Sequence, residues 1–106
     1  SFVKKWHNKL INVHPSLLPA FKGADAQKQA LDYGVKITGC SVHFVRKDVD
    51  SGPIITQAAF PILEGDDVAS LHERGLPYEH RCYLEAIRFI AEDRIKILGE
   101  KVLILD

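Results

Sequence analysis

The chain has no excess of charge of either sign and no long apolar run. Its 106 residues carry 14 Lys and Arg against 14 Asp and Glu. It therefore lacks both the basic field that would attract nucleic acid and an acidic tail. No stretch approaches the roughly 20 apolar residues that a membrane-spanning helix needs, and no signal peptide, internal repeat or low-complexity tract is recognisable. These absences leave a single domain of ordinary size, with 46% hydrophobic residues available for its core.

The chain is also poor in cysteine, with only two, and it lacks the spacings of metal-binding motifs. No Cys-x-x-Cys pair and no His-Glu-x-x-His string occurs. The residues that lack such spacing are His7, His14, His43, His72, His80, Cys40 and Cys82. We therefore expect no metal site, and we expect two reduced thiols in a cytoplasmic protein. We interpret His7 and His72 as surface residues and His43 as a buried, hydrogen-bonded residue.

The most informative segment is Asn12-Val13-His14-Pro15-Ser16-Leu17-Leu18-Pro19, which follows an apolar pair. Side chains alternate faces along a strand, so Asn12 and His14 point the same way at its end. The prolines then forbid continued pairing. An amide and an imidazole on one rigid surface suit a reaction in which a carbonyl oxygen becomes an oxyanion and a proton moves. The alternative is a structural role, because a histidine after a strand is more often a hydrogen-bonded residue than a catalyst.

A second segment, residues 39–55, alternates apolar and polar side chains and then enters a polar loop that ends in Gly52-Pro53. Asp50 lies in that loop, between two expected strands, where its carboxylate can reach a neighbouring strand end. The alternative is that Asp50 is a turn residue, which satisfies N–H groups of its own loop.

The pattern of apolar residues, glycines and prolines predicts the remaining organisation. We expect strands at residues 9–13, 36–45 and 53–60, a helix at 24–33, a second helix starting at 65–67, and a closing hairpin of 95–98 with 102–105. Gly34 is a natural C-cap for the first helix. In the second helix, an apolar stripe at helical spacing predicts core positions: Tyr83, Ile87, Ile90 and Ala91.

Together these segments closely resemble the folate-dependent formyltransferases, best the phosphoribosylglycinamide formyltransferase (glycinamide ribonucleotide transformylase) family. The resemblance rests on residues 12–23, on Val42-His43-Phe44-Val45 and on Asp50-Ser51-Gly52-Pro53-Ile54-Ile55, and it extends to Gly65-Asp66 and Glu79-His80. It implies an α/β protein with the C-terminal half of the Rossmann-like formyltransferase fold, in which helices flank a mixed sheet and a hairpin follows. Residues 1–106 would then form one catalytic domain without the N-terminal nucleotide-binding half, because the glycine-rich phosphate loop of that half has no counterpart here.

The resemblance also implies roles for individual residues. The catalytic residues would be Asn12, His14 and Asp50. The folate-binding residues would be Asn12, Arg46, Lys47, Asp48, Val49 and Asp50. The substrate-binding residues would be Gly23, Leu76, Pro77, Tyr78 and Glu79, with Glu79 at the ribose.

Gly75 and Pro77 depart from a segment that is continuously helical in the family. Inside a helix, proline costs about 3 kcal/mol and glycine about 1 kcal/mol. We therefore expect either a broken helix or a locally remodelled one, with altered substrate contacts at residues 76–78.

The implied activity is transfer of a formyl group from the co-substrate 10-formyltetrahydrofolate to the amine of glycinamide ribonucleotide, in de novo purine (IMP) biosynthesis. It requires no metal. The partners would be these small molecules, with no nucleic acid and no membrane, and a homo-oligomer is left open. One alternative is a formyltetrahydrofolate deformylase, which typically has a second histidine where this chain has Pro15. Another is a methionyl-tRNA formyltransferase, for which a basic surface is lacking. The third is an inactive fragment that retains the scaffold.

Overall fold

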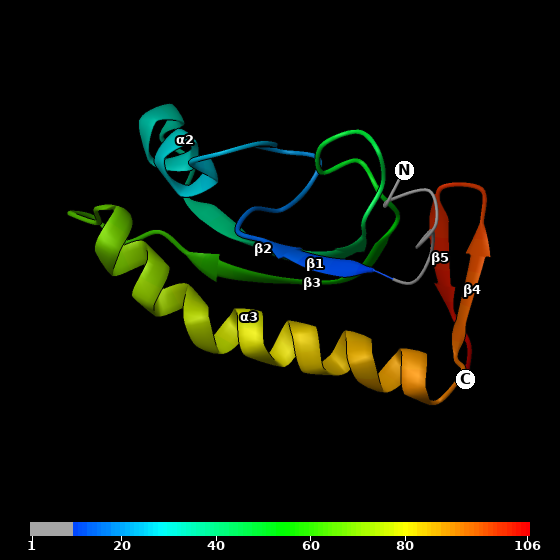
Figure 1. The fold of residues 1–106 in the computed structure, drawn as a ribbon. Coiled ribbons are helices and arrows are strands. Elements are labelled where there is room, and N and C mark those ends of the chain that lie inside the picture. Colours follow the sequence, from blue (N-terminus) through cyan, green and yellow to red (C-terminus); the bar gives the residue numbers. More distant parts are fainter. Residues whose placement is uncertain (1–9) are drawn as a thin grey trace.

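A computed structural model describes residues 10–106 of the chain. Its elements, in chain order, are β1 (Ile11–His14), α2 (Ala26–Tyr33), β2 (Ile37–Phe44), β3 (Ile54–Pro61), α3 (Val68–Ala91), β4 (Ile95–Leu98) and β5 (Lys101–Ile104). The first three strands form one sheet and the last two form a hairpin. Figure 1 shows α3 running along one side of the sheet, with α2 at one end and the hairpin at the other.

The central strand of the sheet, β2, pairs antiparallel with both of its neighbours. The register places Asn12 opposite His43 and His14 opposite Ser41. The α/β class and the closing hairpin are confirmed, but the expected mixed sheet is antiparallel throughout residues 10–106. A parallel pair needs a crossover that returns the chain to the starting end of the sheet. Here α2 lies at the end where β1 finishes and β2 begins, so β2 runs back along β1 (Figure 1).

The expected strands and helices are confirmed, with small shifts at their ends. The helix predicted to stop at Gly34 does so, because Gly34 adopts a left-handed conformation (φ 88°) and its N–H donates to the carbonyl of Ala30. The first residue of the first expected strand, residue 9, lies outside the described residues, as does His7.

Helix α3 begins with a reciprocal capping box and continues without interruption. The Asp67 carboxylate accepts the N–H of Ser70 at 2.8 Å, while the Ser70 hydroxyl accepts the N–H of Asp67 at 3.1 Å. The expected break at Gly75 and Pro77 is wrong, since both lie inside the helix. Glycine fits at position 75 because a β-carbon there would lie 2.8 Å from Cζ of Phe60. Pro77 is exposed, so solvent can satisfy the carbonyl that its missing N–H leaves free.

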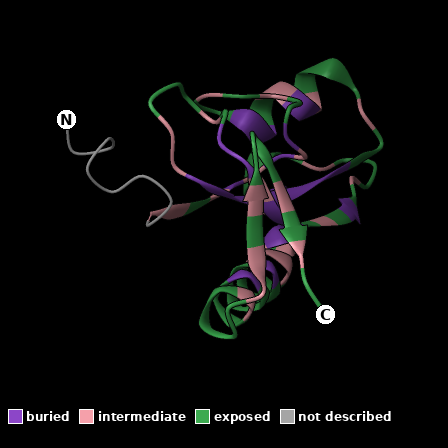
Figure 2. Cartoon of the chain, turned by 90° about the vertical axis from the view of Figure 1, so that its right-hand side faces the viewer, coloured by how far each residue is buried: buried purple, intermediate pink, exposed green. Residues whose placement is uncertain are grey.

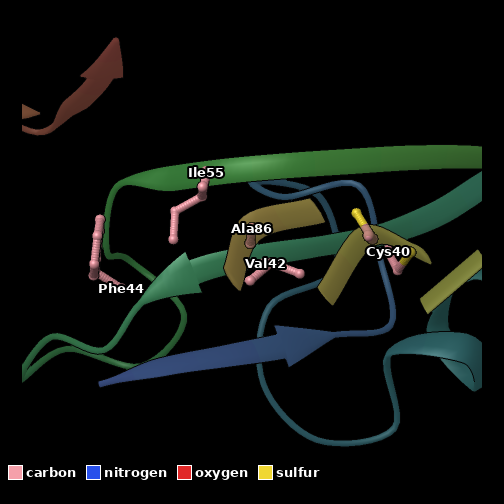
Figure 3. Packing of buried hydrophobic residues seen from close by; sticks show 6 residues of the cluster. Cys40, Val42, Phe44, Ile55 and Ala86 are labelled. Atoms are coloured by element: carbon pink, nitrogen blue, oxygen red, sulfur yellow. The ribbon is translucent and has the colours of Figure 1, made fainter. Parts of the chain in front are cut away.

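Mostly small residues on α3 face the sheet. The buried residues of this helix are Leu71, Gly75, Cys82 and Ala86. Of these, Cys82 and Ala86 pack in one cluster with side chains from the sheet: Cys40, Val42, Phe44 and Ile55 (Figure 3). The stripe expected in the core (Tyr83, Ile87, Ile90 and Ala91) is exposed instead, and that prediction is wrong. Both stripes have helical spacing, but the smaller side chains allow the helix to approach the sheet closely. Figure 2 shows the outer side of α3 exposed and the side that faces the sheet buried.

The hairpin closes one end of the core. Four partly buried side chains pack against the core cluster: Ile95, Ile97, Val102 and Ile104. Arg94 holds the base of the hairpin, because its carbonyl accepts the N–H of Leu105 at 2.7 Å and its Nε donates to the Leu105 carbonyl at 2.6 Å. Among residues 10–106, no helix combines the length and apolar character needed to cross a membrane.

Candidate functional site

The end of β1 carries two of the residues singled out by sequence. Asn12 and His14 are two positions apart, so both project to the face of the sheet opposite α3. His14 is buried, with 5% of its surface exposed, whereas Asn12 is exposed. On the adjacent strand, His43 lies opposite Asn12 and Ser41 lies opposite His14. One face of the sheet therefore carries a patch of four polar side chains.

Both ring nitrogens of His14 lie next to oxygen atoms. Nε2 donates to the carbonyl oxygen of Phe21 at 2.9 Å, and it must carry a proton because a carbonyl oxygen only accepts. Nδ1 lies 3.4 Å from Oδ2 of Asp50. An ionised carboxylate also only accepts, so the ring satisfies both neighbours when each nitrogen carries a proton. The ring can therefore form a hydrogen bond through each of its nitrogens at the same time.

Asp50 lies in the loop between β2 and β3, with a left-handed backbone (φ 51°) that aspartate tolerates better than most residues. Its side chain is 11% exposed. Oδ2 accepts the backbone N–H of Gly23 at 2.8 Å, and Oδ1 lies 3.6 Å from Nε2 of His43. These contacts reach other segments of the chain rather than N–H groups of its own loop. The geometry therefore disfavours a purely local turn role for Asp50.

The loop that carries Asp50 is closed tightly at its base. A β-carbon on Gly52 would overlap the carbonyl oxygen of Phe44, so only glycine fits there. The N–H of Phe44 donates to the carbonyl of Pro53 at 3.0 Å. His43 is buried next to this loop and is hydrogen-bonded, as expected. It is 3% exposed, and its Nδ1 donates to the Phe44 carbonyl at 3.0 Å, which leaves Nε2 facing Asp50.

The residues expected to hold folate form the outer part of this loop. Arg46 is half-buried, with its guanidinium 5.9 Å from the centre of the Phe44 ring and its Nε 3.8 Å from a carboxylate oxygen of Glu100. The next three residues are exposed: Lys47, Asp48 and Val49. A cavity of about 460 Å³ opens between this loop, the loop after β1 and the tip of the hairpin, and Asp50 lines it. Its volume is in the range of small-molecule sites.

The expected substrate-binding residues fall into two places. Gly23 lies beside Asp50, through the hydrogen bond already described. The others lie in α3: Leu76, Pro77, Tyr78 and Glu79. The Tyr78 ring stacks on Phe60, with 4.9 Å between ring centroids, so it belongs to the packing between helix and sheet. Leu76 is partly buried and Pro77 is exposed.

Glu79 lines a second cavity, of about 490 Å³, together with Val13, His80, Tyr83 and Leu84. Burial raises the pKa of the Glu79 carboxyl, and the charges of the exposed His72 and His80 partly oppose that rise. Val13 and His14 are consecutive on β1 and point to opposite faces, so Glu79 and His14 lie on opposite sides of this strand. Within residues 10–106, β1 is at the edge of the sheet.

Sequence analysis missed three contacts of the site. Two are backbone groups, the carbonyl of Phe21 and the N–H of Gly23. The third is the pair Ser41 and Gln57, whose side chains bind each other and the loop after β1. Ser41 does carry a signal, because it is a polar residue on the strand next to His14. The backbone contacts have no such signal, since every residue type has them.

The two thiols are part of the core. Cys40 and Cys82 are both free and buried. The neighbouring Cys82 side chain and burial together raise the pKa of the Cys40 thiol. Cys82 Sγ donates to the hydroxyl of Thr56 at 3.3 Å. In the described part of the chain, no three His, Cys, Asp or Glu side chains are grouped as metal ligands would be.

The chain is similar to known proteins in both sequence and structure. Residues 1–87 match the family model described as formyl transferase. The chain is 52% identical over 99 residues to the human trifunctional purine biosynthetic protein adenosine-3, covering 93% of this chain and 10% of that protein. It is similar in structure to glycinamide ribonucleotide transformylase 1 from Symbiobacterium toebii, with a TM-score of 0.96, 58% identity, and coverage of 98% of this chain and 49% of that one. A formyltetrahydrofolate deformylase from Pseudomonas syringae pv. tomato is less similar, at TM-score 0.93 and 30% identity, with coverage of 99% and 35%.

The chain has an α/β fold in which an imidazole at the end of β1 lies next to a carboxylate from the loop between β2 and β3, and the family match gives the class of protein. The chain belongs to the formyl transferase family. Its relatives include proteins named phosphoribosylglycinamide formyltransferase, of which the one from Mycobacterium tuberculosis is 41% identical over 98 residues. The chain spans 46% of that protein, and about half of the transformylase from Symbiobacterium toebii.

Proposed function

We propose that this chain is the part of a phosphoribosylglycinamide formyltransferase that holds the catalytic residues Asn12, His14 and Asp50. The enzyme would transfer a formyl group from 10-formyltetrahydrofolate to the amine of glycinamide ribonucleotide, in purine biosynthesis in the cytoplasm. The observation that carries the proposal is the pairing of His14 with Asp50 at 3.4 Å, on the face of the sheet to which Asn12 also projects. The names of the relatives favour this reaction over others of the family.

The reaction needs a proton transfer and a stabilised oxyanion. The amine nitrogen attacks the formyl carbon, a new C–N bond forms, and the former carbonyl oxygen takes up negative charge. Collapse of this tetrahedral intermediate breaks the bond to N10 of the folate, while a proton leaves the attacking nitrogen and another reaches N10. Asn12 has a neutral amide donor that can face the oxyanion, and such a donor contributes about 3 kcal/mol to the transition state.

His14 and Asp50 would move the proton. The Asp50 carboxylate would orient the ring, and the ring would donate a hydrogen bond to the oxyanion and then protonate the departing nitrogen. The negative charge of Asp50 is itself held by the N–H of Gly23. His14 would have to exchange its contact with the Phe21 carbonyl for one with the substrate, because a single ring N–H makes only one strong hydrogen bond.

The proposal also assigns the ligand contacts. Asn12 and the loop of residues 46–50 would bind the folate, next to the 460 Å³ cavity that Asp50 lines. Gly23 and residues 76–79 would bind the ribonucleotide, with Glu79 at the ribose.

The second candidate is a deformylase, in which water replaces the amine and formate is released. The observation that favours it is the structural similarity to the enzyme from Pseudomonas syringae. Pro15 argues against it, because we expect a histidine at that position in the hydrolases.

The test is a product assay on the natural polypeptide that contains residues 1–106. We expect formylated glycinamide ribonucleotide to form in proportion to the folate consumed, and Asn12→Ala to lower turnover about a hundredfold or more. Lys28→Ala is the control, because Lys28 is exposed and pairs with its helix neighbour Asp32. Release of formate without an amine product would favour the deformylase. No folate consumption by the natural polypeptide would favour a scaffold without turnover.

A further inference from the structure

The loop after β1 is held on the sheet by a buried hydroxyl. We call residues 15–23 the proline loop. Ser41 is fully buried, and its hydroxyl donates to the carbonyl of Ser16 at 2.8 Å and accepts the N–H of Leu18 at 3.0 Å. A buried hydroxyl that lost these partners would be left with an unsatisfied polar atom, which is unfavourable. Ser41 therefore ties the first half of the proline loop to β2.

Gln57 completes this anchor from the next strand. It lies opposite Ser41 in the pairing of β2 with β3. Its side-chain amide donates to Oγ of Ser41 at 2.9 Å and to the carbonyl of Leu18 at 3.1 Å. A hydroxyl has one donor and two acceptor sites, so Ser41 is saturated by Ser16, Leu18 and Gln57. Gln57 is thus the outermost member of a row of side chains that runs from His14 across all three strands.

The far end of the proline loop carries two backbone groups that form hydrogen bonds with His14 and Asp50. The carbonyl of Phe21 accepts from His14, and the N–H of Gly23 donates to Asp50. Between the anchor at Leu18 and these groups the chain makes a compact turn, because the N–H of Ala20 donates to the carbonyl of Leu17 at 3.0 Å. A shift of Leu18 is therefore passed on to residues 21 and 23.

We propose that Gln57 is a positioning residue, which acts on His14 and Asp50 through the proline loop without touching either of them. Its two amide hydrogens fix Leu18 and Ser41, and the loop then presents its backbone groups to the imidazole and the carboxylate. A misplacement of about 1 Å in a catalytic geometry lowers turnover about a hundredfold. The kinetic part of this inference rests on the proposed formyl transfer, whereas the structural part stands without it.

The test compares Gln57→Glu with a substitution in the core. The glutamate keeps the shape of Gln57 but has no hydrogens to donate, and its charge repels the Leu18 carbonyl. The matched control is Leu71→Val, which trims a fully buried side chain of α3, a helix on the other side of the sheet from the proline loop (Figure 1). We expect Gln57→Glu to lower kcat of the natural polypeptide at least about tenfold, with KM changed less than about twofold, and Leu71→Val to leave both constants unchanged.

Hydrogen exchange gives a readout that does not need activity. In Gln57→Glu, we expect the hydrogen-exchange protection factor of the Gly23 amide to fall at least about tenfold. The protection factor of the Val42 amide, in the central strand, should stay unchanged. Gln57→Ala removes the same hydrogen bonds without adding charge and should reproduce both effects. Unchanged protection at Gly23 in both variants, or an equal loss at Gly23 and Val42, overturns the positioning role.

The two readouts separate this inference from the proposed function. If the natural polypeptide has no formyl transfer activity but Gly23 loses protection selectively, the proposed function fails and the anchoring stands. If transfer is measured and Gln57→Glu leaves kcat unchanged, the function stands and the positioning role is wrong.

Discussion

The N–H of Gly23 donates to Oδ2 of Asp50 at 2.8 Å, and this hydrogen bond joins the loop after β1 to the loop after β2. The same carboxylate oxygen lies 3.4 Å from Nδ1 of His14. The position of the Gly23 backbone thus sets the distance between the carboxylate and the imidazole. The end of β1 and the loop after it thus meet the remote loop of Asp50 at one oxygen atom.

This relationship predicts that Gly23→Ala and Gly34→Ala differ in activity but not in stability. Both glycines are left-handed, with φ of 85° and 88°, and a β-carbon meets no atom within 4 Å at either position. Each substitution should therefore lower the free energy of unfolding by about 1 kcal/mol, measured by urea denaturation. Only Gly23→Ala should also lower kcat, because it moves the N–H that holds Asp50. Equal kcat values for the two variants would contradict the coupling.

Substitutions of the paired residues should be severe and non-additive. Asp50→Asn removes the charge beside the ring, and His14→Asn removes the titrating group. Each should lower kcat about a hundredfold or more, with a smaller effect on KM, because the lost interactions are made in the transition state. The double variant should be little worse than the worse single variant, since the two residues act as one unit. Near wild-type turnover of either single variant would favour a structural role for both residues.

Glu79→Gln should stabilise the fold at neutral pH. Burial raises the pKa of Glu79 in the folded state, so ionisation of this carboxyl opposes folding. This penalty is absent below the unfolded-state pKa of about 4.3 and grows as the pH rises through the raised folded-state value. The variant should therefore unfold at higher urea than the wild type at pH 7, and at the same urea at pH 3.5. A higher KM of Glu79→Gln for the ribonucleotide at pH 7 would further support a substrate role for Glu79.

Asp66→Asn should have the opposite pH dependence. The Arg74 guanidinium, which binds both carboxylate oxygens, holds the pKa of Asp66 well below its usual range. A depressed pKa stabilises the fold above the unfolded-state value of about 3.9, and this contribution is lost as the pH falls toward the folded-state value. The wild type should thus be more stable than Asp66→Asn at pH 6, with a difference that shrinks below about pH 4. A difference that does not depend on pH would contradict the ion pair as its cause.

Gly75→Ala should destabilise the protein although it favours a helix. Alanine is better than glycine in a helix by about 1 kcal/mol. The new β-carbon, however, would lie 2.8 Å from Cζ of Phe60, a buried ring stacked on Tyr78. Overpacking of this kind costs about 1–3 kcal/mol, so the net change should be a loss of up to about 2 kcal/mol in the free energy of unfolding. A gain in stability would show that the ring moves aside freely.

Much of the site could be predicted from the sequence because its side chains follow strand geometry. The spacing of Asn12 and His14 places both on one face, and a polar loop ending in Gly52-Pro53 brings Asp50 back to that face. Gly34 also predicted the end of α2, and Gly65-Asp66-Asp67 predicted the start of α3 to within a few residues. These signals are local, so neither tertiary packing nor knowledge of the partner residues was needed to interpret them.

The parts that could not be predicted depend on distance in space. Two apolar stripes on α3 have the same spacing, and the sheet selects the one with the smaller side chains, which leaves Ile87 and Ile90 exposed. Propensity argued for a break at Gly75 and Pro77, but close contact with Phe60 accounts for the glycine, and exposure makes the proline tolerable. For the stripe on α3 and for Gly75, contacts with residues that are remote in the sequence decided the outcome.

Backbone atoms, rather than side chains, hold His14 and Asp50 from the proline loop, and this has an evolutionary consequence. The carbonyl of Phe21 and the N–H of Gly23 exist whatever side chains residues 20–22 carry. Replacement of these side chains can therefore accumulate with little effect on the pair. Insertion or deletion of a single residue between Leu18 and Gly23 would instead displace both backbone groups at once. Homologous enzymes should accordingly keep the length of this loop constant.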